Sequence, residues 1–415
     1  MDQNLLAAAL TKVRTQTEAL IEGLSAEDCL LQSMSDASPV KWHLAHTTWF
    51  FETFVLEKLA AHHGRPYPAA HPDYRRLFNS YYVGVGACHP RGERGMLSRP
   101  SLTEVLDYRR RIDTQMAELL AKPGLDQSWL DLIELGLQHE QQHQELILTD
   151  LKYHFWRNPL RPAYRPAPLR PTALATSTMS FLPQPGGYAE LGWGGADFCF
   201  DNEQPRHGCW LQPFAIASRL VCNREYLAFM ADDGYRRPEL WLSDGWEVCR
   251  REAWNSPLYW QQDDEVWSVF TLAGQQPLPA DEAVCHLSYY EADAYARWAE
   301  ARLYREEEWE NLATAACLAQ ASQQTATASP APAAPQQMFG EVWQWTGSAY
   351  LPYPGFRPRA GAVGEYNGKF MINQMVLRGG SCVTPGSHLR PSYRNFFPPA
   401  ARWQFSGLRL ARDTG

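Results

Sequence analysis

The segment LQHEQQHQE contains two histidines four residues apart, His139 and His143, with Glu140 beside the first. Residues at this spacing lie on one face of an α-helix, with Cβ atoms about 5–6 Å apart, so both imidazoles can bind one metal ion. The same letters spell H-E-x-x-H, the zinc-peptidase motif, in which the glutamate activates a water molecule. The pattern therefore indicates a metal site, which belongs either to a zinc peptidase or to an enzyme with another metal and another reaction.

The helix face that carries the histidine pair is otherwise mostly apolar. Its members run in the order Leu132, Gly136, His139, His143, Ile147 and Leu151. We therefore expect both histidines to point into the protein interior. Two core histidines that only hydrogen-bond to their neighbours are the alternative interpretation.

The peptidase interpretation lacks a third ligand. The elongated motif requires a further histidine shortly after His143, but the residues that follow are QELILTDLKYHF, and a proline-rich segment comes next. Glu140 lies about 100° around the helix from His139, as an ordinary solvated residue would. We therefore expect a different third ligand.

Two further histidines, His43 and His46, occur in an upstream segment that also has helical periodicity. In helical bundles, ligands for one metal come from facing helices. Three histidines without a carboxylate leave the charge of a divalent cation uncompensated and several coordination positions open. Such a site favours an anionic ligand such as a thiolate, together with O₂, although three histidines suit zinc as well.

Four long amphipathic segments must position these residues. They begin after Asp2, at Ser38 as an N-cap with Pro39 in the first helical position, at Ser101 with Glu104 as a capping box, and after Asp126. The first is expected to run to about residue 24, the second to residue 62, the third to residue 121 and the fourth to residue 155. Together they predict an antiparallel four-helix bundle over residues 1–160.

The remainder of the chain has a different texture. Residues 161–177 are rich in proline and arginine and are expected to form an extended linker. Residues 178–413 are rich in glycine, tryptophan and short apolar runs, which is typical of short strands with a helix or two. Within them, residues 314–337 are of low complexity and are expected to form a surface loop.

The composition excludes several classes of protein. A net charge of −8 offers no basic face for nucleic acid. The nine cysteines contain no CxxC pair, which argues against a disulfide framework. No signal peptide and no long apolar run are found, so we expect a cytoplasmic enzyme that acts on small molecules without a membrane or nucleic-acid partner. The oligomeric state is not indicated.

Several segments resemble the ergothioneine-biosynthesis sulfoxide synthases, the EgtB family. They include SPVKWHLAHTTWFFE, FNSYYVGVGACHPRGERGMLSRP, HEQQHQELILTDLK, GEYNGKFM and VLRGGSCVTPGSHLRPSYRNFFPPAARWQFSGLRLAR. The resemblance implies an α+β multidomain fold, with a DinB-like four-helix bundle followed by a C-type-lectin-like domain similar to formylglycine-generating enzyme. It also implies Fe(II) held by three histidines and O₂ as co-substrate. The implied reaction joins a thiol sulfur to imidazole C2 of hercynine and yields a sulfoxide.

The resemblance implies a role for particular residues of this chain. His46, His139 and His143 match the metal ligands, and Gln142 matches the glutamine that holds the imidazole of hercynine. Other matching positions are Asn395 and Phe396 for the trimethylammonium group, Arg91 for the carboxylate of cysteine, and Tyr81 and Tyr82 as catalytic tyrosines. Attraction of a quaternary ammonium to the face of an aromatic ring supports the role of Phe396.

Two departures from the mycobacterial members bear on the sulfur donor. Those members have an aspartate that helps bind γ-glutamylcysteine where this chain has Phe397, and their catalytic tyrosine comes from the C-terminal domain, where this chain has GEYNGKF. The tandem Tyr81–Tyr82 resembles instead the second type of the family, which accepts L-cysteine. Without the family, an aromatic loop covering the bundle is the simpler interpretation of this pair.

Other functions remain as alternatives. The first is the same reaction with γ-glutamylcysteine as the sulfur donor. The second is the 5-histidylcysteine sulfoxide synthesis of the ovothiol pathway, whose enzymes usually carry a fused methyltransferase. A zinc-dependent DinB-type thiol transferase is a third, and a binding protein that has lost its chemistry is a fourth. The presence of only Cys382 in GGSCVTPGSHLRPSYRN argues against cysteine-to-formylglycine oxidation.

Overall fold

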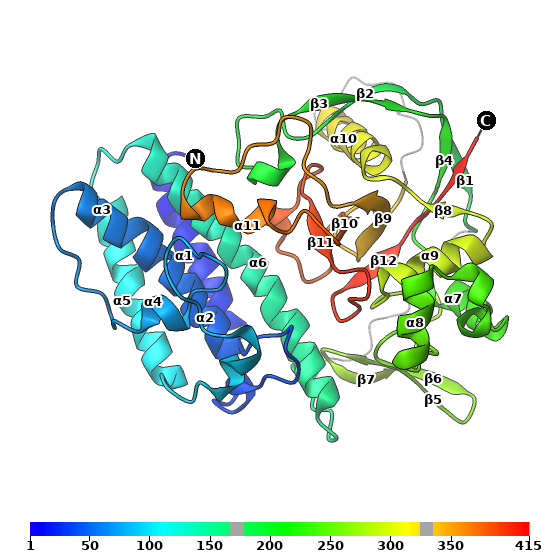
Figure 1. Ribbon diagram of the computed structural model, residues 1–415, viewed down its shortest axis with the longest axis horizontal. Helices are drawn as coiled ribbons and strands as arrows, with labels where there is room; N and C mark the ends of the chain where they lie inside the picture. Colours follow the sequence, from blue (N-terminus) through cyan, green and yellow to red (C-terminus); the bar gives the residue numbers. More distant parts are fainter. Residues whose placement is uncertain (167–177, 324–334, 415) are drawn as a thin grey trace. The chain divides into compact units, whose positions relative to one another are not determined.

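The computed structural model describes residues 1–166, 178–323 and 335–414, which form two compact units (Figure 1). Unit 1 comprises Met1–Tyr164, Ala196–Phe198 and Pro358–Gly368, and unit 2 comprises Arg165–Gly195, Cys199–Arg357 and Lys369–Gly415. Two short segments from the later part of the chain thus belong to the N-terminal unit, which the sequence did not indicate. Most of the linker predicted over 161–177 lies outside the described residues.

Unit 1 is built on four long helices, α1 (Gln3–Ala19), α2 (Val40–Phe50), α5 (Leu102–Leu120) and α6 (Gln127–Arg157). Helices α1 and α2 each pack against both α5 and α6, which confirms the predicted four-helix bundle. Side-chain caps form at two helix starts, and the one at Ser101 is the capping box that the sequence predicts. Asp2 accepts a hydrogen bond from the Leu5 N–H at 2.9 Å, and Ser101 forms a capping box with Glu104.

The prediction that Ser38 caps the second helix is wrong. Pro39 occupies the cap position of α2, and no side chain caps this helix end. The Ser38 N–H donates to Asp150 Oδ2 at 2.8 Å, and its hydroxyl accepts a hydrogen bond from Arg94 at 2.8 Å. Tertiary partners have therefore replaced the local cap.

The second helix is also less regular than predicted. Helix α2 continues directly into a π-helical segment, η2 (Phe51–Leu56), and then into α3 (Glu57–His62). π-helical turns are rare and occur mostly near functional sites. The change in hydrogen-bond spacing comes soon after His46.

Gly136 lets helix α6 approach the second helix closely. A Cβ atom at this position would lie 2.6 Å from Cε1 of Phe51 and 3.0 Å from Cε1 of Phe50. No side chain larger than hydrogen fits there unless these rings move. The glycine lies one turn before His139, so it controls the spacing of the helices that carry the histidines.

The described residues of unit 2 contain short strands in four small sheets. The strands are β1 (Phe181–Gln184), β2 (Gly187–Leu191), β3 (His207–Leu211), β4 (Phe214–Ala217), β5 (Trp260–Asp263), β6 (Val266–Thr271), β7 (Gly274–Pro277), β8 (Arg302–Leu303), β9 (Trp343–Ala349), β10 (Met375–Arg378), β11 (Asn395–Phe397), β12 (Ser406–Leu408) and β13 (Leu410–Asp413). Their orders are β1-β4-β13-β8, β11-β10-β9-β12, β2-β3 and β5-β6-β7. Strand β13, near the end of the chain, pairs with β4, near the start of the unit, so unit 2 closes through long-range contacts.

The α-helices that accompany these strands in the described part of unit 2 are α7 (Asn223–Ala231), α8 (Ser243–Arg251), α9 (Tyr289–Trp298) and α10 (Glu306–Gln323). The predicted helix in LSYYEADAYARWAEARL is confirmed as α9, which begins with a capping box of Ser288 and Glu291. The predicted loop over 314–337 is wrong at its start, because α10 continues to Gln323. This part is rich in alanine, the strongest helix former, and residues 324–334 of the loop lie outside the described part.

No helix within the described residues is both long enough and apolar enough to cross a lipid bilayer. A core in unit 2 instead packs α10 against the strands, with Trp309 and Tyr304 fully buried beside Phe214 and Ile216.

Candidate metal centre

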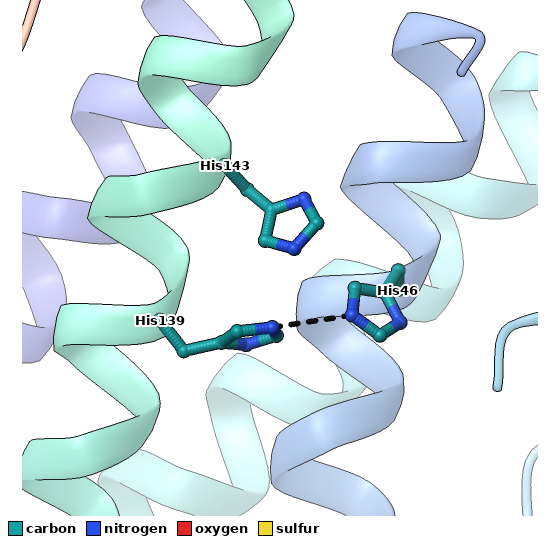
Figure 2. Close-up of side chains that lie close together, drawn as sticks. All are labelled: His46, His139 and His143. Atoms are coloured by element: carbon teal, nitrogen blue, oxygen red, sulfur yellow. Dashed lines mark hydrogen bonds between the residues drawn. The ribbon is translucent and has the colours of Figure 1, made fainter. Parts of the chain in front are cut away.

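Three histidines from two helices of unit 1 point toward one another (Figure 2). His46 comes from α2, and His139 and His143 come from α6. One ring nitrogen of each lies within 4.8 Å of the others, and the group contains no carboxylate. The side chains are 1%, 9% and 8% exposed. The structure therefore brings together the three predicted metal ligands.

The orientation of His46 is held from both sides. Its Nδ1 lies 2.6 Å from the carbonyl oxygen of Phe78, which only accepts hydrogen bonds, so Nδ1 carries the proton. The Trp42 ring stacks on the imidazole with 4.6 Å between centroids. As a result, a lone pair of His46 Nε2 faces the cluster, 3.2 Å from Nε2 of His139.

Burial keeps these imidazoles neutral. It lowers the pKa of His139 to about 4 and the pKa of His46 and His143 well below the ordinary value of 6.5, and the mutual repulsion of the rings adds to the shift for His46 and His143. Neutral imidazole is the form that binds a metal. Three neutral, converging nitrogen donors fit a divalent transition metal ion.

Glu140 is not the solvated residue that the sequence suggested. It is fully buried on another face of α6, where it accepts hydrogen bonds from Arg14 at 2.8 Å, from Arg109 at 2.9 Å and from Thr17 at 2.7 Å. Burial raises its pKa, but the two arginines outweigh this and lower the pKa to about 2. Because both carboxylate oxygens are engaged with α1 and α5, this glutamate is not placed to activate a metal-bound water.

A pocket in unit 1 opens onto the histidine cluster. It is lined by Ser38, Trp42, His43, Ser80, Tyr81, Tyr82, Arg91, Arg94, His139, Gln142, His143, Leu146, Asp150 and Tyr366. Seven of the ten residues proposed from the sequence therefore lie in the cluster or in the wall of its pocket, since His46 contacts the rings of His139 and His143. Their roles toward a ligand stay predictions.

The tandem tyrosines lie in a turn that Asn79 holds. The Asn79 side chain donates to the carbonyls of Tyr82 at 3.0 Å and Gly86 at 3.1 Å, and it accepts a hydrogen bond from the Tyr82 N–H at 3.1 Å. Tyr82 is buried, and the centroid of its ring lies 5.0 Å from that of Phe54. Tyr81 is only half buried, so the two neighbours present their rings differently to the pocket.

A third tyrosine, Tyr366, reaches the pocket from the segment Pro358–Gly368. It belongs to the short helix α11 (Glu365–Gly368), and its ring centroid lies 5.7 Å from that of Tyr81. The neighbouring Glu365 accepts hydrogen bonds from the N–H groups of Val83 at 2.9 Å and Gly84 at 2.8 Å. The carboxylate thus attaches α11 to the turn that carries the tandem tyrosines.

Two arginines of the 3₁₀ helix η3 (Arg91–Met96) line the pocket. Residues three apart eclipse each other in a 3₁₀ helix, so Arg91 and Arg94 share a face. Arg94 is 3% exposed, and its Cζ atom lies 3.4 Å from the centroid of the Trp42 ring. It forms no ion pair with a carboxylate among the described residues. Burial lowers its pKa to about 9, with a smaller effect of Arg91.

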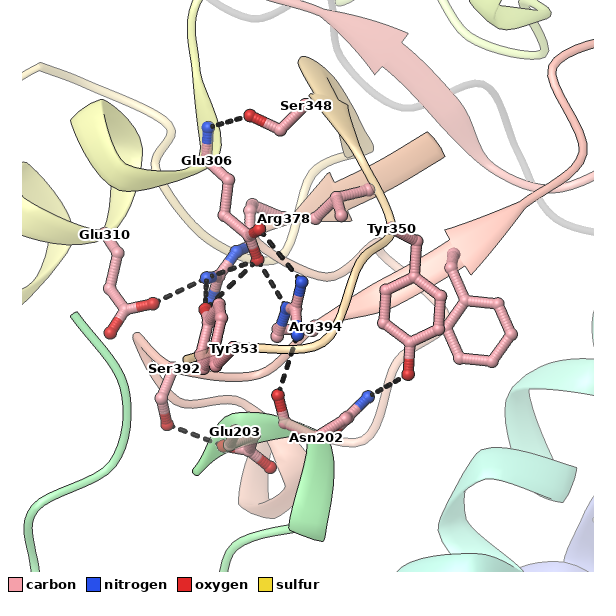
Figure 3. Close-up of polar contacts among 12 residues, drawn as sticks. Asn202, Glu203, Glu306, Glu310, Ser348, Tyr350, Tyr353, Arg378, Ser392 and Arg394 are labelled. Carbon is pink, nitrogen blue, oxygen red and sulfur yellow. Dashed lines mark hydrogen bonds and ion pairs between the residues drawn. The ribbon is translucent and has the colours of Figure 1, made fainter. Parts of the chain in front are cut away.

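The remaining three proposed residues, Asn395, Phe396 and Phe397, form strand β11 of unit 2. Phe396 stacks on Tyr350 with 4.1 Å between centroids. Arg394, next to the strand, donates to Glu306 Oε1 at 2.6 Å and belongs to a buried cluster of arginines and glutamates (Figure 3). This cluster fixes the start of β11, while the contact of these residues with a ligand stays a prediction.

Four residues of this site are not among those predicted from the sequence, although three of them leave a signal there. Asp150 follows His143 by two helical turns, which places both on one face of α6, and Arg94 follows Arg91 by three residues, the repeat of a 3₁₀ helix. Tyr366 lies in GEYNGKF, where the mycobacterial members have their catalytic tyrosine, while the sequence gives His43 no role. The proximity of Tyr366 to Tyr81 depends on a contact that spans most of the chain, which no local pattern reports.

Two family models match the chain. A model of the DinB superfamily matches residues 9–147, and a model of the sulfatase-modifying factor enzyme 1-like domain matches residues 168–334 and 319–414. These matches confirm the predicted fold class, with an N-terminal DinB-like helical domain and a C-terminal domain of the formylglycine-generating-enzyme type.

Three relatives are similar over nearly the whole length, and each carries the name hercynine oxygenase. The protein of Mycolicibacterium thermoresistibile is 31% identical over 98% of this chain and 94% of its own length. The protein of Mycolicibacterium smegmatis is 31% identical, and that of Mycobacterium tuberculosis is 32% identical, each over 98% of both chains.

Proposed function

The chain belongs to the hercynine oxygenase family, and on this premise we propose that it joins the sulfur of L-cysteine to imidazole C2 of hercynine and oxidises that sulfur to a sulfoxide. The reaction consumes the C2–H and S–H bonds and one O₂. One oxygen atom enters the sulfoxide, and the other leaves as water with the two hydrogens. O₂ is the four-electron oxidant that this balance requires.

The observation that carries the proposal is the group of three neutral imidazoles in a buried pocket that also contains arginine. The ligands bring no negative charge, so the charge of a bound divalent cation is left for an anionic substrate group. We assign Fe(II) to His46, His139 and His143. When bound, iron supplies redox chemistry with O₂ and favours the thiolate form of the sulfur donor.

Arg91 and Arg94 are suited to hold the carboxylate of the sulfur donor. Arg94 is desolvated and lacks a carboxylate partner among the described residues, so a substrate carboxylate gains a charge-assisted hydrogen bond there. Arg91 faces the same pocket from the more exposed side. A carboxylate bound between them orients the cysteine sulfur toward the histidines.

Gln142 contributes to hercynine binding in this proposal, since it lines the pocket between the two histidines of α6. Its amide can hydrogen-bond a ring nitrogen of the substrate and thereby orient C2. Asn395 and Phe396 are proposed to contact the trimethylammonium group. Phe397, where an acidic side chain is absent, favours L-cysteine over γ-glutamylcysteine.

The hydroxyl groups of Tyr81, Tyr82 and Tyr366 are the candidate proton or hydrogen-atom donors, because all three residues line the pocket. Burial and the nearby Tyr81 raise the pKa of Tyr366 far above its usual value, so its hydroxyl stays protonated and able to donate. Such a donor would favour C–S bond formation over simple oxidation of the thiol to cysteine sulfinate.

An aerobic assay tests the function directly. The protein is reconstituted with Fe(II) and given hercynine with either cysteine or γ-glutamylcysteine, and the products are identified by mass. We expect hercynylcysteine sulfoxide from cysteine and no product without O₂. Turnover with Zn²⁺ alone would contradict the assigned metal, and turnover of unmethylated histidine but not hercynine would contradict the assigned substrate.

Single replacements separate the three tyrosines. Tyr81→Phe, Tyr82→Phe and Tyr366→Phe each keep the ring and remove one hydroxyl. We expect the variant that lacks the donor to shift its products from sulfoxide toward cysteine sulfinate, while the other two keep the wild-type ratio. An unchanged ratio in all three variants would exclude a tyrosine as the donor.

A further inference from the structure

His143 is the end of a chain of buried polar side chains that no part of the proposed reaction uses. Its Nδ1 lies 2.8 Å from Nδ1 of His43, and Nε2 of His43 lies 3.1 Å from Oδ2 of Asp150. His43 is 2% exposed and Asp150 is 2% exposed. These hydrogen bonds connect α6 to α2 and back to α6, because Asp150 and His143 belong to α6 and His43 belongs to α2.

The direction of the hydrogen bonds follows from the carboxylate. An ionised carboxylate only accepts hydrogen bonds, and Oδ2 of Asp150 already accepts the Ser38 N–H at 2.8 Å. The proton of His43 therefore resides on Nε2, and its Nδ1 presents a lone pair to His143. In turn, His143 must carry its proton on Nδ1, which leaves the lone pair of Nε2 for the metal pocket.

We propose that Asp150 and His43 are positioning residues that select the metal-binding tautomer of His143. The inference rests on the proposed metal-dependent function and adds to it the way in which one ligand is prepared. Partners of this kind fix the tautomer and ring orientation of histidine ligands, and their loss typically weakens metal binding about 10–100-fold. In His46 the tautomer is fixed by a different partner, the carbonyl oxygen of Phe78, which accepts the proton of Nδ1.

The alternative is a purely structural role, in which the chain only satisfies buried polar atoms. The two interpretations differ in what they say about protons. A structural role tolerates either tautomer of His143 as long as the contacts remain, whereas the proposed role requires the proton of His143 on Nδ1 and that of His43 on Nε2. The orphaned Oδ1 of Asp150, buried without a partner in the described structure, shows that satisfaction of polar atoms is incomplete here.

The first measurement is the affinity of the full-length protein for Co²⁺, by titration calorimetry without substrate. His43→Phe keeps an aromatic ring but removes the acceptor, and we expect its dissociation constant to rise 10–100-fold. His43→Asn retains an oxygen near the position of Nδ1, so we expect a loss of less than tenfold. His154→Phe is the matched control, since His154 is also buried on α6 but bonds Ser33, and it should bind Co²⁺ like the wild type.

The second measurement reads the tautomers in the metal-free wild type by long-range ¹H–¹⁵N NMR of labelled histidine. We expect a proton on Nδ1 of His143 and on Nε2 of His43, and a mixture of tautomers for His143 in Asp150→Leu. A proton on Nε2 of His143 in the wild type would overturn the proposal, even where a variant fails to fold.

The outcomes distinguish this inference from the function on which it rests. Wild-type Co²⁺ affinity in a folded His43→Phe variant, judged by circular dichroism, would overturn the positioning role and leave the proposed function standing. Failure of the wild type itself to bind Co²⁺ would overturn both.

Discussion

Figures 2 and 3 show two buried polar clusters, one in each unit, that handle burial in opposite ways. In unit 2, Arg378 donates to Glu306 at 2.8 Å and to Glu310 at 2.5 Å, and Arg394 also binds Glu306. Two cations thus face two carboxylates, so the opposite charges of this cluster are paired within the protein. In unit 1, three imidazoles converge with no opposite charge among them.

The difference teaches how a ligand site is distinguished from a structural cluster. Buried charges are stable only when paired and hydrogen-bonded, which unit 2 achieves with its own side chains. Burial lowers the pKa of the three histidines, so that they stay uncharged. Their nitrogen lone pairs face one another, and a bound cation would accept all three. The predictions below test this contrast, from the largest effect to the smallest.

The first prediction concerns His139→Ala, which removes one of the three converging donors. Binding energies of about 10–16 kcal/mol for four-ligand zinc sites correspond to about 3 kcal/mol per ligand. We therefore expect Co²⁺ affinity to fall roughly a hundredfold or more and sulfoxide formation to disappear. His388→Ala, at a fully buried histidine of unit 2, should bind Co²⁺ like the wild type; equal losses in both variants would contradict the assignment.

The second prediction concerns Arg378→Met in the charge-paired cluster of unit 2. The change leaves Glu306 and Glu310 buried without this cation, and breaking such a pair costs about 3–5 kcal/mol of the free energy of unfolding. Urea denaturation measures the loss, while Co²⁺ affinity of the folded protein should not change. The exposed pair of Arg206 and Glu190 provides the control, because Arg206→Met should cost less than about 1 kcal/mol.

The third prediction separates Glu140 from its neighbour His139. Glu140→Gln keeps one oxygen acceptor but removes the charge that Arg14 and Arg109 share, and we expect a loss of about 1.5–3 kcal/mol of unfolding free energy. Metal affinity should stay within a few-fold of the wild type, because the carboxylate faces away from the histidines. Abolished turnover in a variant with normal stability and metal binding would instead identify Glu140 as a catalytic base.

The fourth prediction is a small pH effect in unit 2. Burial, with a contribution from Arg390, lowers the pKa of His388 well below 6.5. The neutral ring therefore contributes its full stability above about pH 6.5, and this contribution is lost as the pH falls below 6.5, where the unfolded state takes up the proton. The difference in thermal midpoint between wild type and His388→Phe should shrink from pH 7.5 to pH 5.5.

A difference for His388→Phe that is constant or grows toward pH 5.5 would contradict the neutral state of this histidine.

The sequence was most informative where structure is local. The capping box at Ser101 and the apolar periodicity of the long helices predicted the bundle, because helix formation depends on neighbours within one or two turns. It failed at Ser38, whose hydrogen-bond groups found Asp150 and Arg94 instead of a helix end. It failed again at residues 314–323, where low complexity concealed a continued helix.

By itself, the sequence determined which residue types are present and which share a helix face, and this sufficed to propose His139 and His143 as a pair. Only the tertiary structure decided that Glu140 is buried between two arginines, that Tyr366 reaches the pocket from the far end of the chain, and that Asp150 orients His43. These features depend on contacts between distant segments and on the burial that sets the charge of each group. Neither is encoded in the spacing of neighbouring residues.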